Sequence, residues 1–329
     1  MILVTGAAGH IGNVLVRELV EKGEKVRALI LPGEDTHSIY GLDIEIVVGN
    51  VLDPVSLERA MRGVDIVYHL AGIISILPDK NDLMWQVNVE GTRNVLAAAK
   101  KEGVKRLVHT ASIHALSRNW IGMINEDVPF DPDATAGGYD RTKAAASLLV
   151  LEAVKEGLDA VIVCPTGVIG PHDYRGSEMG DLILDWVRNK LNFLVKGAYD
   201  FVDVRDVAHG HILACERGRS GEVYILSGWQ IKVLELKQLV QNALGKHIPV
   251  ITLPMWMAKF GAKFMPLFYK ISRRRPRFTD YSLETLQSNS SVSSAKAQKE
   301  LGYHPRDLKS TITDTVNWLV RRIDRVRKH

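Results

Sequence analysis

Three residues in the middle of the chain have the types and spacing needed for acid–base chemistry. Tyr139 and Lys143 are four positions apart, which places both side chains on one face of a helix, one turn apart. A lysine ammonium beside a phenol favours the phenolate, so the spacing predicts a tyrosine pKa below its usual value of about 10. Ser112 ends an apolar run of strand length and could hydrogen-bond a carbonyl. The three together predict a site for hydride transfer with proton transfer at oxygen.

The Tyr-x-x-x-Lys spacing is weak by itself, because chance supplies many such surface pairs. The first stretch of the chain strengthens it. An apolar run at residues 2–5 meets Gly6, Gly9 and Gly12, and an amphipathic segment follows. Glycines let the backbone approach a pyrophosphate closely, and the helix N-terminus offers free N–H groups to the phosphates. The order of strand, turn and helix therefore predicts dinucleotide binding; the alternative is a glycine turn without a ligand.

The remaining pattern predicts the elements that position these residues. Apolar runs at residues 25–31, 44–49, 64–72 and 106–110 alternate with helical segments, and residues 138–155 form the helix that carries Tyr139 and Lys143. This alternation is typical of an α/β, Rossmann-type doubly wound parallel sheet. We expect a dinucleotide-binding domain at 1–165, to which 200–228 returns. A smaller C-terminal substrate-binding lobe is expected from 166–199 and 229–329.

The end of the second predicted strand bears on the cofactor. In dinucleotide folds an acidic residue there binds the ribose 2′-hydroxyl, whereas a nearby arginine accommodates a 2′-phosphate. Here the strand ends in Ile30 and Leu31, which supply neither group, so the choice between NAD and NADP stays open. Further along, Asp206 is expected to cap a helix.

Composition excludes several other classes of protein. With 329 residues, 46% hydrophobic and 24% charged, the chain is neither disordered nor fibrous. The net charge is +4, and the sequence has no basic stripe interleaved with aromatic residues, which nucleic-acid binding would need. Cys164 and Cys215 have no metal-like spacing, so neither a metal site nor a disulfide is predicted. Two cysteines, the lack of a leader-like start and the lack of an apolar run of about 18 residues favour a cytoplasmic protein.

Several motifs resemble those of one family, the extended short-chain dehydrogenases/reductases, which include the NAD-dependent epimerases and dehydratases. They are TGAAGHIG (5–12), HLAG (69–72), NVEGT (88–92), TAS (110–112), YDRTK (139–143) and CPTGVIGP (164–171), followed by FVDVRDVA (201–208) and LGYHPR (301–306). Within the family the chain is most similar to the dihydroflavonol-4-reductase-like group. It departs at Leu31, where those reductases commonly carry arginine. Nucleotide-sugar members usually have arginine and asparagine where this chain has Cys164 and Gly167.

The resemblance implies roles for particular residues. Tyr139 would be the catalytic acid/base, Lys143 would also hold the nicotinamide ribose, and Ser112 would orient the reacting oxygen. The helices that begin at Asn88 and Tyr139 would pair with their copies in a homodimer. NAD(P) is the implied cofactor, bound by Gly6, Ala8, Gly9, His10, Ile11, Gly12, Leu31, Asn50, Val51, Leu70, Ala71, Gly72, Tyr139, Lys143, Pro165 and Val168.

These observations favour an NAD(P)-dependent oxidoreductase that moves a hydride between nicotinamide and a ketone or secondary alcohol. The alternative enzyme is a nucleotide-sugar epimerase or dehydratase. A non-catalytic sensor of the nicotinamide state is a third hypothesis, and the complete set of Ser112, Tyr139 and Lys143 speaks against it. The partner is a small molecule, and its identity and the direction of reaction are not fixed by the motifs.

Residues 254–271 are rich in methionine and aromatic side chains, and the arginine run Arg273–Arg277 follows them closely. A helix that closes the core of the second lobe is the first interpretation, and the composition favours it. The second is an adaptable apolar wall for a lipid-like or polycyclic substrate, with the arginines against an anionic membrane surface.

Overall fold

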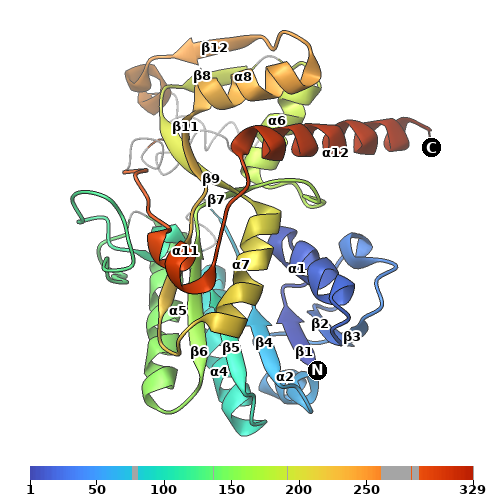
Figure 1. Cartoon of the computed structure of the whole chain (residues 1–329), viewed down its shortest axis with the longest axis vertical. Helices are drawn as coiled ribbons and strands as arrows, with labels where there is room; N and C mark the ends of the chain where they lie inside the picture. Colours follow the sequence, from blue (N-terminus) through green and yellow to red (C-terminus); the bar gives the residue numbers. More distant parts are fainter. Residues whose placement is uncertain (76–80, 136, 191, 261–282, 284–288, 329) are drawn as a thin grey trace.

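The computed structural model describes residues 1–75, 81–135, 137–190, 192–260, 283 and 289–328. Its centre is a seven-stranded parallel sheet, the large sheet, in the order β10-β6-β5-β4-β1-β2-β3 (Figure 1). This confirms the predicted Rossmann-type sheet. The strand order reverses between β1 and β4, and ligands of open α/β sheets bind at the carboxyl ends beside such a switch point. The strands are β1 (Ile2–Thr5), β2 (Val26–Ile30), β3 (Glu45–Val48), β4 (Ile66–His69), β5 (Arg106–Thr110), β6 (Ala160–Pro165) and β10 (Val223–Leu226).

Helices cover both faces of the large sheet (Figure 1). α1 (His10–Glu21), α7 (Val204–Arg217) and α11 (Ala295–Leu301) pack on one face, and α2 (Pro54–Met61), α4 (Gly91–Lys101) and α5 (Gly138–Lys155) pack on the other. Successive residues of β1 alternate between the two cores: Ile2 and Val4 join the first and Leu3 joins the second. Because both faces are buried, the strands read as continuous apolar runs, which is the pattern the sequence shows.

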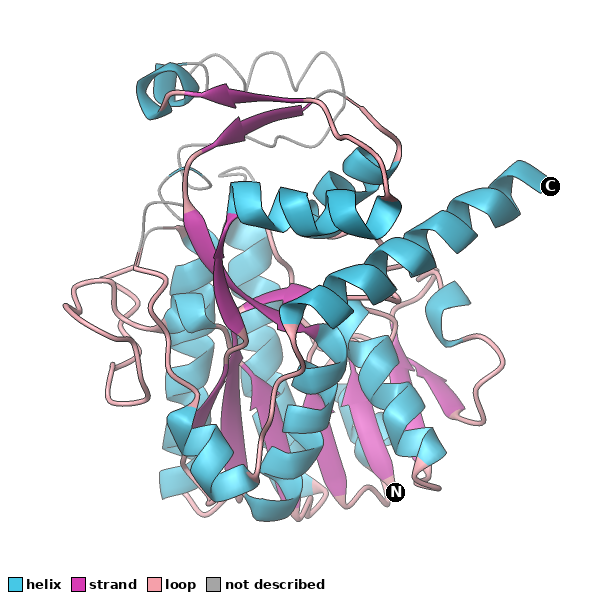
Figure 2. Cartoon of the chain, turned by 45° about the horizontal axis from the view of Figure 1, so that its top comes forward, coloured by secondary structure: helices cyan, strands magenta, loops and turns pink. Residues whose placement is uncertain are grey.

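A second group of elements lies beyond the carboxyl ends of the large sheet (Figure 2). β7 (Gly167–Ile169), β9 (Ala198–Asp203) and β11 (Trp229–Lys232) form one small sheet, and β8 (Asn192–Val195) pairs with β12 (Val250–Leu253). α6 (Glu178–Val187), α8 (Val233–Leu244) and α12 (Leu308–Lys328) pack around them. This group has a core of its own, in which Ile183, Trp186 and Leu236 are fully buried. Its β9 strand leads directly into α7 of the large sheet.

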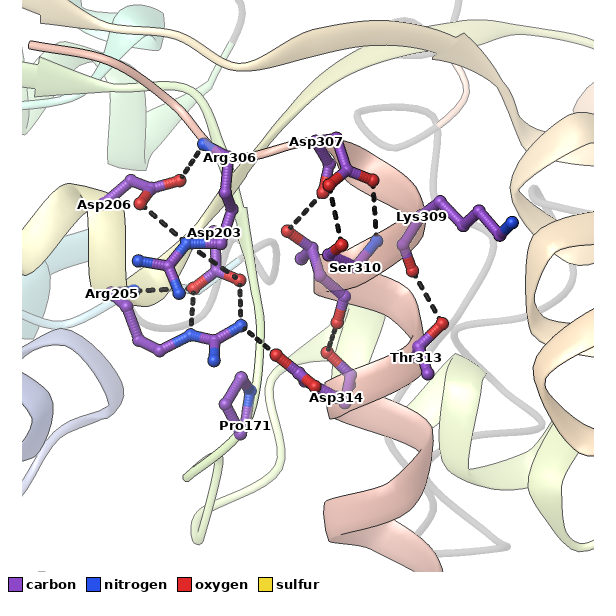
Figure 3. A network of polar contacts seen from close by, with 12 residues as sticks. Pro171, Asp203, Arg205, Asp206, Arg306, Asp307, Lys309, Ser310, Thr313 and Asp314 are labelled. Carbon is purple, nitrogen blue, oxygen red and sulfur yellow. Dashed lines mark hydrogen bonds and ion pairs between the residues drawn. The ribbon is translucent and has the colours of Figure 1, made fainter.

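An ion-pair network joins the start of α7 to the start of α12 (Figure 3). The Asp203 carboxylate accepts the Arg205 N–H at 2.8 Å and so caps α7. The expected cap at Asp206 is therefore wrong, because β9 runs on to Asp203 and the helix begins at Val204. Asp206 instead accepts the backbone N–H and the Nε of Arg306, both at 2.8 Å. Arg205 also pairs with Asp314 at 2.8 Å, which fastens α12 to the base of α7.

Short helical segments complete the structure: η1 (His37–Ile39), α3 (Asn81–Trp85), η3 (Gln86–Glu90) and η4 (Ile113–Ala115). The helix predicted from Asn88 begins earlier, and Asn88 lies in η3, a π-helical turn that runs into α4. Such turns interrupt the regular ladder and often lie at functional sites. Among the described residues, no helix combines the length and apolarity that crossing a membrane requires. Residues 261–282 lie outside the described residues. They include the arginine run Arg273–Arg277, whose contact with a membrane surface was one of the two interpretations.

Candidate active site

The glycine turn between β1 and α1 has space for backbone only. Gly6 has a φ of +69°, and a Cβ there would lie 2.8 Å from the amide nitrogen of Ala71. A Cβ on Gly12 would lie 2.1 Å from the carbonyl oxygen of Gly6. Gly9 donates its N–H to that same oxygen at 3.0 Å and precedes α1 without a side-chain cap. The first N–H groups of α1 have no acceptor within the helix, so the turn fits a dinucleotide pyrophosphate.

Ser112, Tyr139 and Lys143 come together beside this turn. Ser112 follows β5, is buried, and its Oγ accepts the N–H of His114 at 3.2 Å. Ser112 lies close enough to the Tyr139 phenol to act on its pKa, which the serine lowers. Lys143 Nζ, one helical turn further along α5, donates to the carbonyl oxygen of Thr110 at 2.6 Å. A Cβ on Gly72 would lie 3.5 Å from Nζ, so the lysine also borders the loop that follows β4.

The electrostatics of this site differ from the expectation. Burial raises the pKa of Tyr139 above its usual value, and Ser112 opposes this only in part. Burial lowers the pKa of Lys143 to about 8. The predicted lowering of the tyrosine pKa by Lys143 is therefore wrong for this structure, because loss of water around the phenol dominates. At neutral pH the phenol carries its proton and can donate it.

His69, at the end of β4, fixes the loop that carries Leu70, Ala71 and Gly72. Thr5 Oγ1 accepts the Ala71 N–H at 3.1 Å. Thr92 donates its hydroxyl to the Asn88 carbonyl at 2.7 Å, so it accepts from His69 Nε2 at 3.0 Å. His69 Nδ1 therefore accepts the Thr5 hydroxyl at 2.8 Å. Burial lowers the pKa of His69 to about 3, so the ring is neutral and can hold this tautomer. The histidine positions the loop after β4 and stays uncharged.

Asn88 is a site residue to which the sequence assigned no chemical role. Its Oδ1 accepts the Ile73 N–H at 2.8 Å and its Nδ2 donates to the Ile73 carbonyl at 3.0 Å. The same Nδ2 donates to Thr142 Oγ1 at 2.9 Å, and Thr142 stands beside Lys143 in α5. Asn88 thus ties the loop after β4 to the helix of the tyrosine. The available signal was a polar residue in the buried part of a helix.

The predicted cofactor residues lie along the carboxyl edge of the large sheet or next to it. Leu31 follows β2, Asn50 and Val51 follow β3, Pro165 ends β6, and Val168 lies in β7. His10, the first residue of α1, bonds through Nε2 to the Pro171 carbonyl at 3.0 Å and so connects the glycine turn to the loop after β7. His114, next to Ser112, bonds to the hydroxyl of Tyr199 in β9.

A glycine turn, a switch point and a serine, tyrosine and lysine grouped at one sheet edge define a dinucleotide-dependent oxidoreductase class. The family model described as "NAD dependent epimerase/dehydratase family" matches residues 2–227, and the chain belongs to this family. The family is described as NAD-dependent, which fits the glycine turn described above.

Known relatives span nearly the whole chain. "Sterol demethylase protein B" of Methylococcus capsulatus is 37% identical over 96% of this chain and 97% of its own length. A "putative dihydroflavonol 4-reductase" of Synechocystis is 31% identical over 96% of this chain and 93% of its own length.

Solved structures show the same fold. The crystal structure of gox2253 superimposes with a TM-score of 0.85 at 33% identity and covers 98% of both chains. UDP-glucose 4-epimerase of Thermotoga maritima, solved with UDP-glucose, reaches a TM-score of 0.82 at 21% identity over 98% of this chain and 99% of its own. At that identity the likeness concerns the fold alone.

Proposed function

We propose that this NAD(P)-dependent oxidoreductase moves a hydride between nicotinamide and a ketone or secondary alcohol on an apolar skeleton. The grouping of Ser112, Tyr139 and Lys143 carries the chemical part of the proposal: Ser112 acts on the Tyr139 pKa, and Lys143, one helical turn further along α5, bonds to the Thr110 carbonyl. The polarity of the substrate is inferred from exposed residues in the loop after β4 and in the loop that joins Ser112 to Tyr139.

In the reducing direction, Tyr139 donates its proton to the substrate oxygen as that oxygen gains negative charge. Ser112 hydrogen-bonds the same oxygen and holds it in place, which stabilises the charge that develops in the transition state. The Thr110 carbonyl accepts a hydrogen bond from the Lys143 ammonium and holds it beside Gly72. There the ammonium can bind the ribose of a bound coenzyme. The nicotinamide, when bound, supplies the hydride. In the oxidising direction Tyr139 would receive the proton as the phenolate, so the phenol must first ionise.

Exposed apolar side chains favour an apolar substrate. Ile74 lies in the loop after β4, and Trp120, Ile121 and Met123 lie in the loop between Ser112 and Tyr139. We call these four residues the apolar rim. Ile121 is 96% exposed, and so large an apolar group in water usually marks a binding surface when it is one of several. A relative named for sterol demethylation supports a polycyclic or terpenoid substrate for this chain.

The second candidate is a nucleotide-sugar epimerase or dehydratase, which the family name and the fold of the Thermotoga maritima enzyme favour. Such an enzyme reoxidises its coenzyme within each cycle and keeps it bound. Cys164 and Gly167 stand where nucleotide-sugar members usually carry arginine and asparagine, which favours the reductase.

Turnover by purified, coenzyme-stripped protein separates the two candidates. We expect NADH or NADPH oxidation at 340 nm with polycyclic or terpenoid ketones and none with nucleotide sugars. Epimerised or dehydrated nucleotide sugar, formed with tightly retained NAD, would overturn the proposal. Steroid ketones and UDP-glucose make suitable first probes.

We further propose that substrates bind between the carboxyl edge of the large sheet and the second group of elements.

A homodimer formed through α4 and α5 is also proposed, and the exposed Leu148 on α5 supports it. Light scattering should give twice the chain mass, and Leu148→Glu should lower the measured mass. A monomeric wild type would refute the dimer.

A reducing, cytoplasmic location is proposed because Cys164 and Cys215 are both free and buried.

A further inference from the structure

We propose that Glu34 and Arg175 set the coenzyme preference of this protein and make it select NAD over NADP. The inference rests on the proposed function, because it concerns the dinucleotide of the same site. From the sequence, the end of β2 carries neither an acid nor an arginine. The structure corrects this, because it brings one of each to the end of that strand.

A tight turn carries Glu34 back to the end of β2. Gly33 has a φ of +74°, and the Glu34 N–H donates to the Leu31 carbonyl at 3.1 Å. The Leu31 N–H in turn donates to Glu34 Oε2 at 2.8 Å. The Glu34 side chain is only 13% exposed. The carboxylate therefore stands at the strand end, although the residue comes three positions later in the sequence.

This strand end borders the glycine turn. β2 pairs in parallel with β1, with Leu29 opposite Thr5, so Leu31 ends beside the start of the turn. Ser38, in the same loop as Glu34, donates its hydroxyl to the Ala8 carbonyl at 3.0 Å. In such folds the adenosine ribose lies at this place. A carboxylate here accepts a hydrogen bond from a 2′-hydroxyl and repels a 2′-phosphate.

Arg175 reaches the same place from the loop after β7, and its guanidinium pairs with Glu34. α12 holds that loop independently of Glu34. Arg322 donates to the carbonyl oxygens of Asp173 and Tyr174 at 3.0 and 2.8 Å. The Tyr174 ring also meets the His37 ring edge-on, with centroids 5.6 Å apart. Arg175 is therefore expected to stay in place when Glu34 is replaced.

The pair predicts how preference changes on substitution. While Glu34 is charged, it occupies the Arg175 guanidinium and repels added phosphate. Glu34→Gln removes the negative charge and keeps a similar shape, which releases Arg175 to bind a 2′-phosphate through two parallel hydrogen bonds. Asp35 is the matched control, because it is the adjacent exposed acid and bonds to the His37 N–H rather than to Leu31.

The test measures dissociation constants of NADH and NADPH for coenzyme-free protein by fluorescence titration. We expect wild type to bind NADH at least ten-fold more tightly than NADPH. Glu34→Gln should lower the dissociation constant of NADPH and raise that of NADH, each by about ten-fold, as expected for one charge-assisted hydrogen bond. Asp35→Asn should change either constant by less than about three-fold, since it leaves Glu34 and Arg175 paired.

The double variant Glu34→Gln/Arg175→Gln identifies the source of any gain. It should lose the NADPH affinity that Glu34→Gln acquires, because no guanidinium remains to bind the phosphate. A wild type that prefers NADPH, or a Glu34→Gln variant with an unchanged ratio of the two constants, would overturn the inference and leave the proposed function standing. Wild type that binds neither coenzyme would instead refute the proposed function. Circular dichroism confirms that each variant is folded.

Discussion

The carboxyl edge of the large sheet and the apolar rim, which we propose to border the same substrate, are built in opposite ways. At the edge, Ser112, Lys143 and His69 are buried, and each makes a specified hydrogen bond. On the rim, Ile74, Ile121 and Met123 expose most of their apolar surface. The edge can fix the geometry of a reaction because burial allows one arrangement only. The rim can accept apolar molecules of different shapes, so the chemistry and the choice of substrate reside in separate residues.

The largest expected effect on the edge comes from Tyr139→Phe. It removes the proton donor and should lower kcat by about a thousand-fold, within the range usual for a general acid. Steady-state turnover of an apolar ketone measures this, and NADH affinity should change by less than about three-fold, since the phenol hydroxyl contributes one hydrogen bond at most. Tyr199→Phe is the matched control because it removes another half-buried phenol, the one that bonds to His114.

Equal losses from Tyr139→Phe and Tyr199→Phe would show that the site needs a phenol for packing rather than for proton transfer. That result would mean that Tyr139 has no chemical role that Tyr199 lacks.

Gly6→Ala tests whether the edge depends on backbone approach. The residue has a φ of +69° and an added Cβ would meet Ala71 N at 2.8 Å, so we expect a loss of about 3 kcal/mol in unfolding free energy. NADH affinity should fall as well. Gly23→Ala is the control, because Gly23 has a φ of +80° with nothing within 4 Å of an added Cβ. Equal losses in urea denaturation for the two variants would contradict the close approach.

The buried Lys143 predicts a pH dependence of stability. Its pKa falls to about 8 in the folded protein, against 10.5 as the reference value. Between these values the unfolded chain binds more protons, so wild-type stability rises with pH. Lys143→Met lacks this penalty, and its stability relative to wild type should fall by about 2 kcal/mol between about pH 7 and about pH 9.5. Urea denaturation at several pH values measures it, and a constant difference would refute the burial of a charge.

The smallest effect is expected on the rim. The double variant Ile121→Ser/Met123→Ser should raise KM for a steroid ketone by about ten-fold, because apolar contact with the substrate is lost. It should leave kcat nearly unchanged, because the reacting groups stay in place. Tyr40→Ser is the control, since Tyr40 is 84% exposed and follows η1, away from the loop between Ser112 and Tyr139. Unchanged KM would mean that the rim does not contact substrate.

Most of the fold was predictable from the sequence because its signals are local. The apolar runs, the glycine spacing and the helix at residues 138–155 each follow from short-range rules, and the structure has that helix at Gly138–Lys155. The α7 cap was misplaced by three positions, because the length of β9 decides whether Asp203 or Asp206 comes first in the helix. That length depends on pairing with β7 and β11.

The sequence predicted that Tyr139 and Lys143 lie near each other, and it did not predict the electrostatics around them. Spacing places Tyr139 and Lys143 on one helix face, whereas the pKa of each depends on how much water the surrounding elements exclude. Glu34 shows the same limit. The sequence alone places Leu31 at the end of β2, whereas a turn at Gly33 brings the Glu34 side chain back to that strand end. Contacts between distant segments, such as Glu34 with Arg175, carry no spacing that periodicity could reveal.

The transfer of deuterium tests the central claim most directly. The protein would be incubated with an apolar ketone and NADH or NADPH carrying deuterium at C4 of the nicotinamide, and the products would be analysed by mass spectrometry. We predict a secondary alcohol with one deuterium on the former carbonyl carbon, formed about a thousand-fold more slowly with Tyr139→Phe. An unchanged ketone together with conversion of a nucleotide sugar, with no label taken from free coenzyme, would contradict the account.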